Sequence, residues 1–239
     1  MSVTEILRTE FDTTLATFAG SPAMRMLAAG SITVAHYKAI LRETYHYTKE
    51  DPQIQALAAI YLRGDDRGTV RMFLKHATSE IGHDLMALED LKSLGEDVST
   101  IPTTMPLPAT IALTAFPFYQ IQYHNPVGYL GYLYFLEYMP TQAGAGYRSA
   151  LHAAGIPYEA MTFLDEHTTV DVAHNKLMEE YVRRLVRTEG DVAAIRYAIR
   201  VTGYLYGEML TGAVRSVGRE PMSWPNHVEI SRGNNPAHA

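Results

Sequence analysis

The 239-residue chain contains no cysteine. Disulfide bonds, thiolate metal sites and cysteine nucleophiles are therefore excluded, and we expect a cytoplasmic protein. Basic residues are also scarce, because 20 lysines and arginines face 26 aspartates and glutamates and leave a net charge of −6. Such a chain has little attraction for nucleic acid or an anionic membrane, so we expect a small-molecule substrate and neither of those partners.

Charged residues are missing altogether from Val98 to Leu136. Prolines and polar residues interrupt every window of roughly 20 residues that a membrane-spanning helix would need. This stretch therefore predicts a buried layer or a cavity wall. The stretch from Met1 to Phe18 has three acidic residues and no apolar block, so it is not typical of a signal peptide.

Apolar residues recur at helical spacing along almost the whole sequence, and no segment alternates as a strand would. We predict an all-α fold, with a single bundle of about seven helices over residues 1–219 and an irregular tail over 220–239. Ser31 is expected to cap one helix and Asp191 the last one. A long helix is expected between these caps, closed by Gly95. Its expected first residue is Asp65 or Asp66.

Glu137 is the only charged residue between Val98 and Tyr147. Helical spacing places it on one face with Leu130 and Tyr134, so its carboxylate should point into an apolar interior. An ionised carboxylate left alone there would cost several kcal/mol, so Glu137 must be protonated, paired or bound to metal. A protonated or tyrosine-bonded core glutamate is the simpler alternative.

Three ligand-type side chains, His167, Asp171 and His174, occur at positions i, i+4 and i+7. This spacing places them on one helix face over two turns. Leu164 and Met178 continue the same stripe, so polar groups stand where apolar residues would face the core. The pattern favours a metal site, and a surface or hydrogen-bonded cluster is the alternative.

Glu80 and His83 form a Glu-x2-His pair, an arrangement that holds metal ions inside helix bundles. The pair is weak evidence alone, because an acid three residues before a histidine is expected about once by chance in this composition. Glu43 and His46 repeat the pattern. A ferritin-like centre that uses these two pairs with Glu10 is one alternative.

The candidate ligands suit two metal ions better than one. Oxygen and nitrogen donors without sulfur favour iron or manganese, and we favour iron. The set contains three imidazoles and three carboxylates, namely Glu80, His83, Glu137, His167, Asp171 and His174.

At these residues the sequence resembles the haem-oxygenase-like di-iron oxidases, also described as iron-containing redox enzymes. The likeness covers about residues 5–217. It implies a haem-oxygenase-like bundle, two Fe(II)/Fe(III) ions held by the six ligands, and O₂ as co-substrate. A reductase or a ferredoxin is the candidate external electron donor, and a homodimer follows by analogy with relatives that pair.

The resemblance implies a non-haem di-iron oxidoreductase that acts on a small amino-acid-like or aromatic metabolite. The reaction would be C–H abstraction, C–C cleavage or N-oxidation, including chemistry of the nitrile-forming type. A fatty-acid oxidative decarboxylase of the same family is one alternative. A metal-free helical binding protein is the other.

Aromatic residues of the charge-free stretch and its continuation are candidates for a substrate pocket. Phe116, Tyr134 and Tyr138 could supply rings and hydroxyl groups, with ordinary core packing as the alternative. Asp84, Thr168 and Tyr138 are each next to an expected ligand in the sequence. They are the candidates to orient the ligand side chains.

Overall fold

The computed structural model describes residues 1–62 and 67–224, with the side chains of 169–173 excepted. This part of the chain confirms the all-α prediction. Of its helices, none combines the length and apolar character that crossing a membrane requires. The elements are α1 (Val3–Ala19), α2 (Pro22–Ala28), α3 (Val34–Thr48), α4 (Asp51–Tyr61), α5 (Arg67–Ser79), α6 (His83–Ser93), η1 (Ile101–Thr103), α7 (Pro108–Tyr123), η2 (Pro126–Gly128), α8 (Tyr129–Ala153), η3 (Tyr158–Ala160), α9 (Thr162–Leu185) and α10 (Glu189–Arg215).

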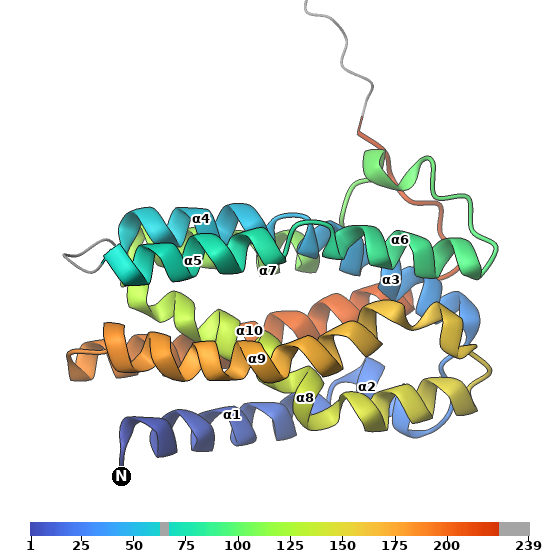
Figure 1. Cartoon of the computed structure of the whole chain (residues 1–239). Helices are drawn as coiled ribbons and strands as arrows, with labels where there is room; N and C mark the ends of the chain where they lie inside the picture. Colours follow the sequence, from blue (N-terminus) through green and yellow to red (C-terminus); the bar gives the residue numbers. More distant parts are fainter. Residues whose placement is uncertain (63–66, 225–239) are drawn as a thin grey trace, which may run out of the picture.

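The helices are stacked in layers (Figure 1). In that view α4, α5 and α6 run along the top, α9 and α10 run through the middle, and α1 and α2 lie at the bottom. Helix α10 packs against α1, α3, α7 and α8, while α8 also packs closely against α9. Helices α8 and α10 therefore join the layers of the bundle.

Two helix starts differ from the expected capping residues. Thr33, and not Ser31, caps α3, because its hydroxyl accepts the backbone N–H of the third helical residue. The hydroxyl of Ser31 instead donates to a carbonyl of α2. Thr188 caps α10, and Asp191 returns a bond to the backbone N–H of Thr188. Asp191 is thus the reciprocal partner in a capping box.

The long helix expected to end at Gly95 is interrupted in the structure. Helix α5 ends at Ser79 and α6 begins at His83. Between them Gly82 has φ of 99°, a left-handed conformation that no continuous α-helix contains and that glycine adopts most easily. Ile81, an apolar residue, is 70 % exposed at this break. The interruption lies beside Glu80, a candidate ligand.

Two further boundary predictions reach beyond the described residues. The expected helix start at Asp65 or Asp66 lies outside them. Of the tail expected over 220–239, only the first residues are described, and there the backbone N–H of Met105 donates to the carbonyl of Met222 at 2.7 Å. The tail therefore begins as irregular chain held against the loop before α7. Its boundary at residue 219 stays a prediction.

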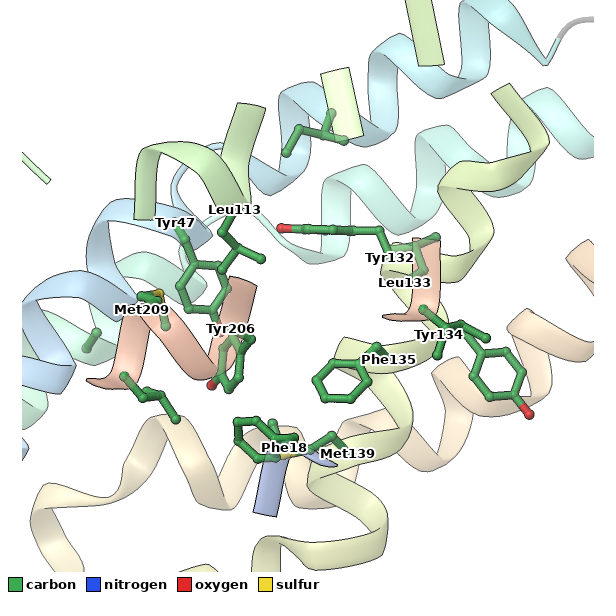
Figure 2. Close-up of a cluster of buried hydrophobic side chains, with 14 of the residues drawn as sticks. Phe18, Tyr47, Leu113, Tyr132, Leu133, Tyr134, Phe135, Met139, Tyr206 and Met209 are labelled. Atoms are coloured by element: carbon green, nitrogen blue, oxygen red, sulfur yellow. The ribbon is translucent and has the colours of Figure 1, made fainter. Parts of the chain in front are cut away.

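Aromatic side chains fill the interior next to α8 (Figure 2). Phe135 packs edge-on against Phe18, with ring centroids 5.8 Å apart, and Tyr47 packs edge-on against Tyr206 at the same distance. Tyr134 points away from this group in Figure 2. The first half of α8 is buried almost throughout, which confirms the burial predicted for the end of the charge-free stretch.

Candidate metal centre

Four buried ligand-type side chains converge between α5, α8 and α9. His76 lies on α5, Glu80 follows the end of that helix, Glu137 lies on α8 and His174 lies on α9. Each offers one ligand atom within 4.8 Å of those of the other three. We call these residues the first group.

A second group adjoins the first and shares one member with it. Glu80, His83 and His167 also place their ligand atoms within 4.8 Å of one another. Glu80 Oε1 lies 3.3 Å from Nε2 of His76, whereas Oε2 lies 2.8 Å from Nδ1 of His83. The two oxygens of a single carboxylate therefore face the two groups, as in a carboxylate that bridges two metal ions.

Glu137 makes its close contacts with histidines. Its Oε2 lies 2.9 Å from Nδ1 of His174, and its Oε1 lies 3.1 Å from Nε2 of His76. This buried carboxylate is thus paired with two imidazoles, which is one of the outcomes expected for a charge inside an apolar interior.

The pairing outweighs the effect of burial on the charges of the centre. Burial alone would raise the pKa of Glu137, but His174 and His76 hold it well below its ordinary value. Burial would likewise raise the pKa of Glu80, yet His76 and His83 lower it to about 2. Both carboxylates are therefore ionised near neutral pH, the form in which they bind metal ions.

His167 is held in the tautomer that a metal ligand requires. Its Nδ1–H donates to the backbone carbonyl of Phe163 at 2.7 Å. The lone pair is therefore on Nε2, and burial lowers the pKa of the ring, which favours its neutral form. Its ring lies 4.8 Å from that of His83. A backbone carbonyl that orients a ligand histidine is a common feature of metal sites.

The donor atoms fit metal ions better than they fit one another. Glu80 Oε1, both ring nitrogens of His76 and Nδ1 of His83 are buried without a well-formed hydrogen bond. Their short contacts miss the direction in which a ring N–H would point, and unsatisfied polar atoms are costly in a protein interior. Iron or manganese ions would satisfy Glu80 Oε1, Nδ1 of His83 and one ring nitrogen of His76.

The structure brings together five of the six ligands expected from the sequence: Glu80, His83, Glu137, His167 and His174. The side chain of the sixth, Asp171, lies outside the described residues. Helix α9 runs unbroken through this position. Asp171 therefore stays a prediction.

His76 is the ligand candidate that sequence reasoning missed. It precedes Glu80 by four residues, a spacing that places two side chains on one helix face. The Glu-x2-His pattern places the acid three residues before the histidine and therefore does not include His76, which precedes its acid. His76 is 2 % exposed, and its ring centroid lies 4.4 Å from that of His174.

The alternative ferritin-like centre is not assembled. Glu10 pairs with Arg196 and Arg200 on α10, at 2.7 and 3.0 Å. The carboxylate of Glu43 accepts a hydrogen bond from the hydroxyl of Thr110, away from Glu80 and His83. The described residues therefore offer no common site for the acids of that proposal.

Two of the three residues expected to orient the ligands, Thr168 and Tyr138, bond elsewhere. The hydroxyl of Thr168 donates to the carbonyl of Leu164 within α9, at 2.7 Å. The hydroxyl of Tyr138 donates to the carbonyl of Asn175 at 3.3 Å. Asp84 lies in the first turn of α6. Neighbours of a ligand along a helix point in other directions, which explains the difference.

A cavity of about 70 Å³ adjoins the centre, and Glu80, Glu137 and His167 form part of its wall. An apolar cavity of about 110 Å³ lies next to it. The two cavities are adjacent, because four residues line both: Met139, Phe163, Leu164 and Tyr206.

The three aromatic residues expected to line a substrate pocket are placed elsewhere. Tyr134 stacks on Tyr138 with ring centroids 4.3 Å apart, and both rings pack against Phe11. Phe116 packs against Tyr197 of α10. The cavity beside Glu80, Glu137 and His167, which we call the metal-side cavity, is lined by other tyrosines instead: Tyr47, Tyr132 and Tyr206.

The fold and the buried carboxylate–histidine cluster are typical of all-α proteins that hold metal ions inside a helical bundle. Residues 38–205 match the family described as iron-containing redox enzymes, with a haem-oxygenase-like fold. The chain belongs to this family, as the resemblance in its ligand pattern implied. No curated protein matches its sequence.

Solved structures share the same fold. A domain of unknown function with a haem-oxygenase-like fold from Shewanella denitrificans is 28 % identical, with a TM-score of 0.77 over 90 % of this chain and 93 % of that one. A TenA homologue from Pyrococcus horikoshii is 15 % identical, with a TM-score of 0.68 over 90 % and 99 % of the two chains. A TenA homologue from Pseudomonas syringae is 10 % identical, with a TM-score of 0.69 over 90 % and 93 %.

Proposed function

We propose that this protein is a non-haem di-iron oxidoreductase that uses O₂ to oxidise a small metabolite, by C–H abstraction, C–C cleavage or N-oxidation. The observation that carries the proposal is the position of Glu80, whose two carboxylate oxygens face two separate sets of imidazoles. A carboxylate whose two oxygens face different ligand sets suits two neighbouring metal ions better than one.

The two groups assign residues to each ion. His76, Glu80, Glu137 and His174 would hold one ion, and Glu80, His83 and His167 would hold the other. Asp171, on the same helix as His167 and His174, is the candidate for a further ligand. Bound ferrous ions would supply the electrons with which O₂ is reduced.

The protein itself positions the groups and excludes water. Glu80, Glu137 and His174 are each at most 8 % exposed, so bulk water reaches the centre only to a small extent. The Phe163 carbonyl fixes the His167 ring. A substrate in the adjoining cavity would lie against Glu80, Glu137 and His167 and hence beside both ions.

Anaerobic titration of the metal-free protein with Fe(II) tests the proposal. About two equivalents per chain should bind, and His174→Ala or His76→Ala should lower this to about one by removing a ligand of the first group. His124→Ala is the matched control, because His124 is exposed and belongs to neither group. O₂ consumption after admission of air should follow the iron content.

Unaltered iron binding in both variants would overturn the ligand assignment. Absence of iron binding by the unaltered protein would favour a metal-free helical binding protein. In that case His174→Ala would lower stability and leave the metal content at zero.

A further inference from the structure

We propose that Asp51, Gln55 and Tyr132 form a subsite that binds the primary ammonium group of an amine substrate beside the metal centre. The inference deepens the proposed function and rests on it, since the bound amine would be the molecule oxidised there.

The three side chains line the same cavity as the ligands Glu80 and Glu137. Asp51 and Gln55 are one turn apart on α4, so both can present oxygen atoms from one helix face. Tyr132, on α8, donates its hydroxyl to Oδ1 of Asp51 at 3.1 Å. This bond ties the carboxylate to the helix that carries Glu137.

Gln55 supplies the observation that calls for a ligand. Its side chain is in the cavity wall, the residue is 1 % exposed, and its Oε1 has no hydrogen-bond partner among the described residues. A buried carbonyl oxygen without a donor costs roughly 1–3 kcal/mol. An ammonium group has three N–H donors and can satisfy Gln55 and Asp51 together.

The alternative role for Asp51 is purely structural, because an acid in the first turn of α4 interacts favourably with the helix dipole. That role explains neither the unpaired oxygen of Gln55 nor the bond from Tyr132. A ligand that binds Asp51, Gln55 and Tyr132 together would explain why all three side chains lie in the wall of one cavity.

The side chains around the cavity favour a cation over an anion. No lysine or arginine is among the described residues that line either cavity. Burial raises the pKa of Asp51 well above its ordinary value and so favours its neutral form. An ammonium group beside Asp51 would favour the ionised carboxylate, because the opposite charge and the hydrogen bonds offset the cost of burial.

The apolar cavity indicates the rest of the ligand. It shares Met139, Phe163, Leu164 and Tyr206 with the metal-side cavity and is otherwise lined almost entirely by hydrophobic side chains. An amine bound at Asp51 could therefore place an alkyl or aromatic body there. We infer an apolar primary amine, either a simple amine or an amino acid with an apolar side chain.

Calorimetric titration of the protein with matched six-carbon probes tests this subsite. Hexylamine, hexanoate and hexan-1-ol are titrated into the metal-free protein and into the anaerobic Fe(II)-loaded protein. Hexylamine should bind at least about tenfold more tightly than the other two, the usual effect of one charge-assisted hydrogen bond. In Asp51→Asn this preference should disappear while Fe(II) binding is unchanged.

Glu43→Gln is the matched control, because Glu43 is also a buried carboxylate, bonded to Thr110 outside both cavities. It should keep the preference for hexylamine. If Asp51→Asn does not fold, Gln55→Leu provides the second variant, with weaker amine binding expected. Circular dichroism and Fe(II) binding verify that each variant is folded.

The results separate this inference from the proposed function. Tighter binding of hexanoate, or equal hexylamine affinity in Asp51→Asn and Glu43→Gln, overturns the amine subsite even if iron binds normally. Hexylamine binding that requires Asp51 in a protein that takes up no iron supports the subsite and contradicts the di-iron proposal.

A fourth probe, 2-aminohexanoate, distinguishes the two kinds of amine. An amino acid whose carboxylate reaches the metal ions should bind the Fe(II)-loaded protein more tightly than the metal-free protein. A site for simple amines should bind hexylamine at least as tightly as 2-aminohexanoate in both forms.

Discussion

At the scale of single residues, histidines serve this protein in more than one way. His76 and His174 face carboxylates in the candidate centre. His46 is also buried, but its Nε2 lies 2.8 Å from the hydroxyl of Thr104, and among the described side chains no carboxylate pairs with it. Buried histidines therefore differ in charge preference according to their partners.

His46 predicts a pH dependence of stability in the metal-free protein. Burial lowers its pKa from 6.5 to about 4. Between pH 6.5 and 4 the unfolded chain therefore binds a proton at His46, whereas the folded chain keeps this ring neutral. The stabilisation that depends on the neutral ring is complete above pH 6.5 and declines as the pH falls to 4. The loss is ~3 kcal/mol at most.

Urea unfolding at pH 7, 6, 5 and 4 measures this effect. The difference in unfolding free energy between wild type and His46→Gln should shrink towards acid pH, because the variant lacks the titrating ring. A difference that stays constant from pH 7 to 4 would show that His46 does not titrate in this range. Glu80 and Glu137 titrate below their ordinary pKa values and are common to both proteins.

At the scale of helices, two glycines set the geometry around the centre. Gly82 interrupts the helical run that carries His76, Glu80 and His83. Gly131, on α8, allows α10 to approach closely. One acts through its backbone angle and the other through its lack of a side chain.

Gly82→Ala should destabilise the protein by about 1–2 kcal/mol, because alanine is strained at positive φ. Gly82 has φ of 99°, and an added Cβ would have no atom within 4 Å. Backbone strain, and not a collision, is therefore the cause of the expected destabilisation. Fe(II) affinity should fall as well, since Glu80 and His83 lie on the two sides of the turn. Thermal unfolding and Fe(II) titration measure the two effects.

Gly146→Ala is the control for this substitution. Gly146 lies within α8 with nothing within 4 Å of an added Cβ. There alanine should stabilise the helix by up to about 1 kcal/mol. Equal stability changes in Gly82→Ala and Gly146→Ala would contradict the role assigned to the turn.

Gly131→Ala should destabilise by about 1–3 kcal/mol through overpacking. An added Cβ would lie 2.2 Å from the carbonyl oxygen of Ile195 and 2.7 Å from Cβ of Ala198. Both contacts involve the rigid body of α10, so the two helices would have to separate. Urea unfolding against the same Gly146→Ala control measures the cost, and an unchanged midpoint would show that α8 and α10 can adjust freely.

At the scale of the whole molecule, the centre joins parts of the chain that are far apart in sequence. Its candidate ligands come from α5, the turn before α6, the start of α6, α8 and α9. Ions bound to them would therefore connect two layers of the bundle (Figure 1). Metal binding and global stability should be coupled.

Anaerobic Fe(II) should raise the thermal unfolding temperature of the protein. Ligand that binds only the folded state at 100 times its dissociation constant adds about 2.7 kcal/mol. The increase should be smaller in His76→Ala and His174→Ala than in His124→Ala. An unfolding temperature that is unchanged by Fe(II) at saturating concentration would contradict this coupling.

The sequence by itself determined the helical class and most of the candidate centre. Helical spacing and the isolation of Glu137 in a charge-free stretch require no tertiary information, because periodicity and burial cost act locally. The His167-x3-Asp171-x2-His174 pattern placed its histidines on one helix face in the same way. These features carry the resemblance to the family.

Only the tertiary structure decided which side chains meet. His76 entered the first group because α5 approaches α8 and α9, and Gly82 ended α5 where helical periodicity predicted continuation. Tyr132 and Tyr134 are two residues apart, yet only Tyr132 lines the metal-side cavity. Contacts between helices depend on their packing angles and distances, which a one-dimensional pattern does not contain.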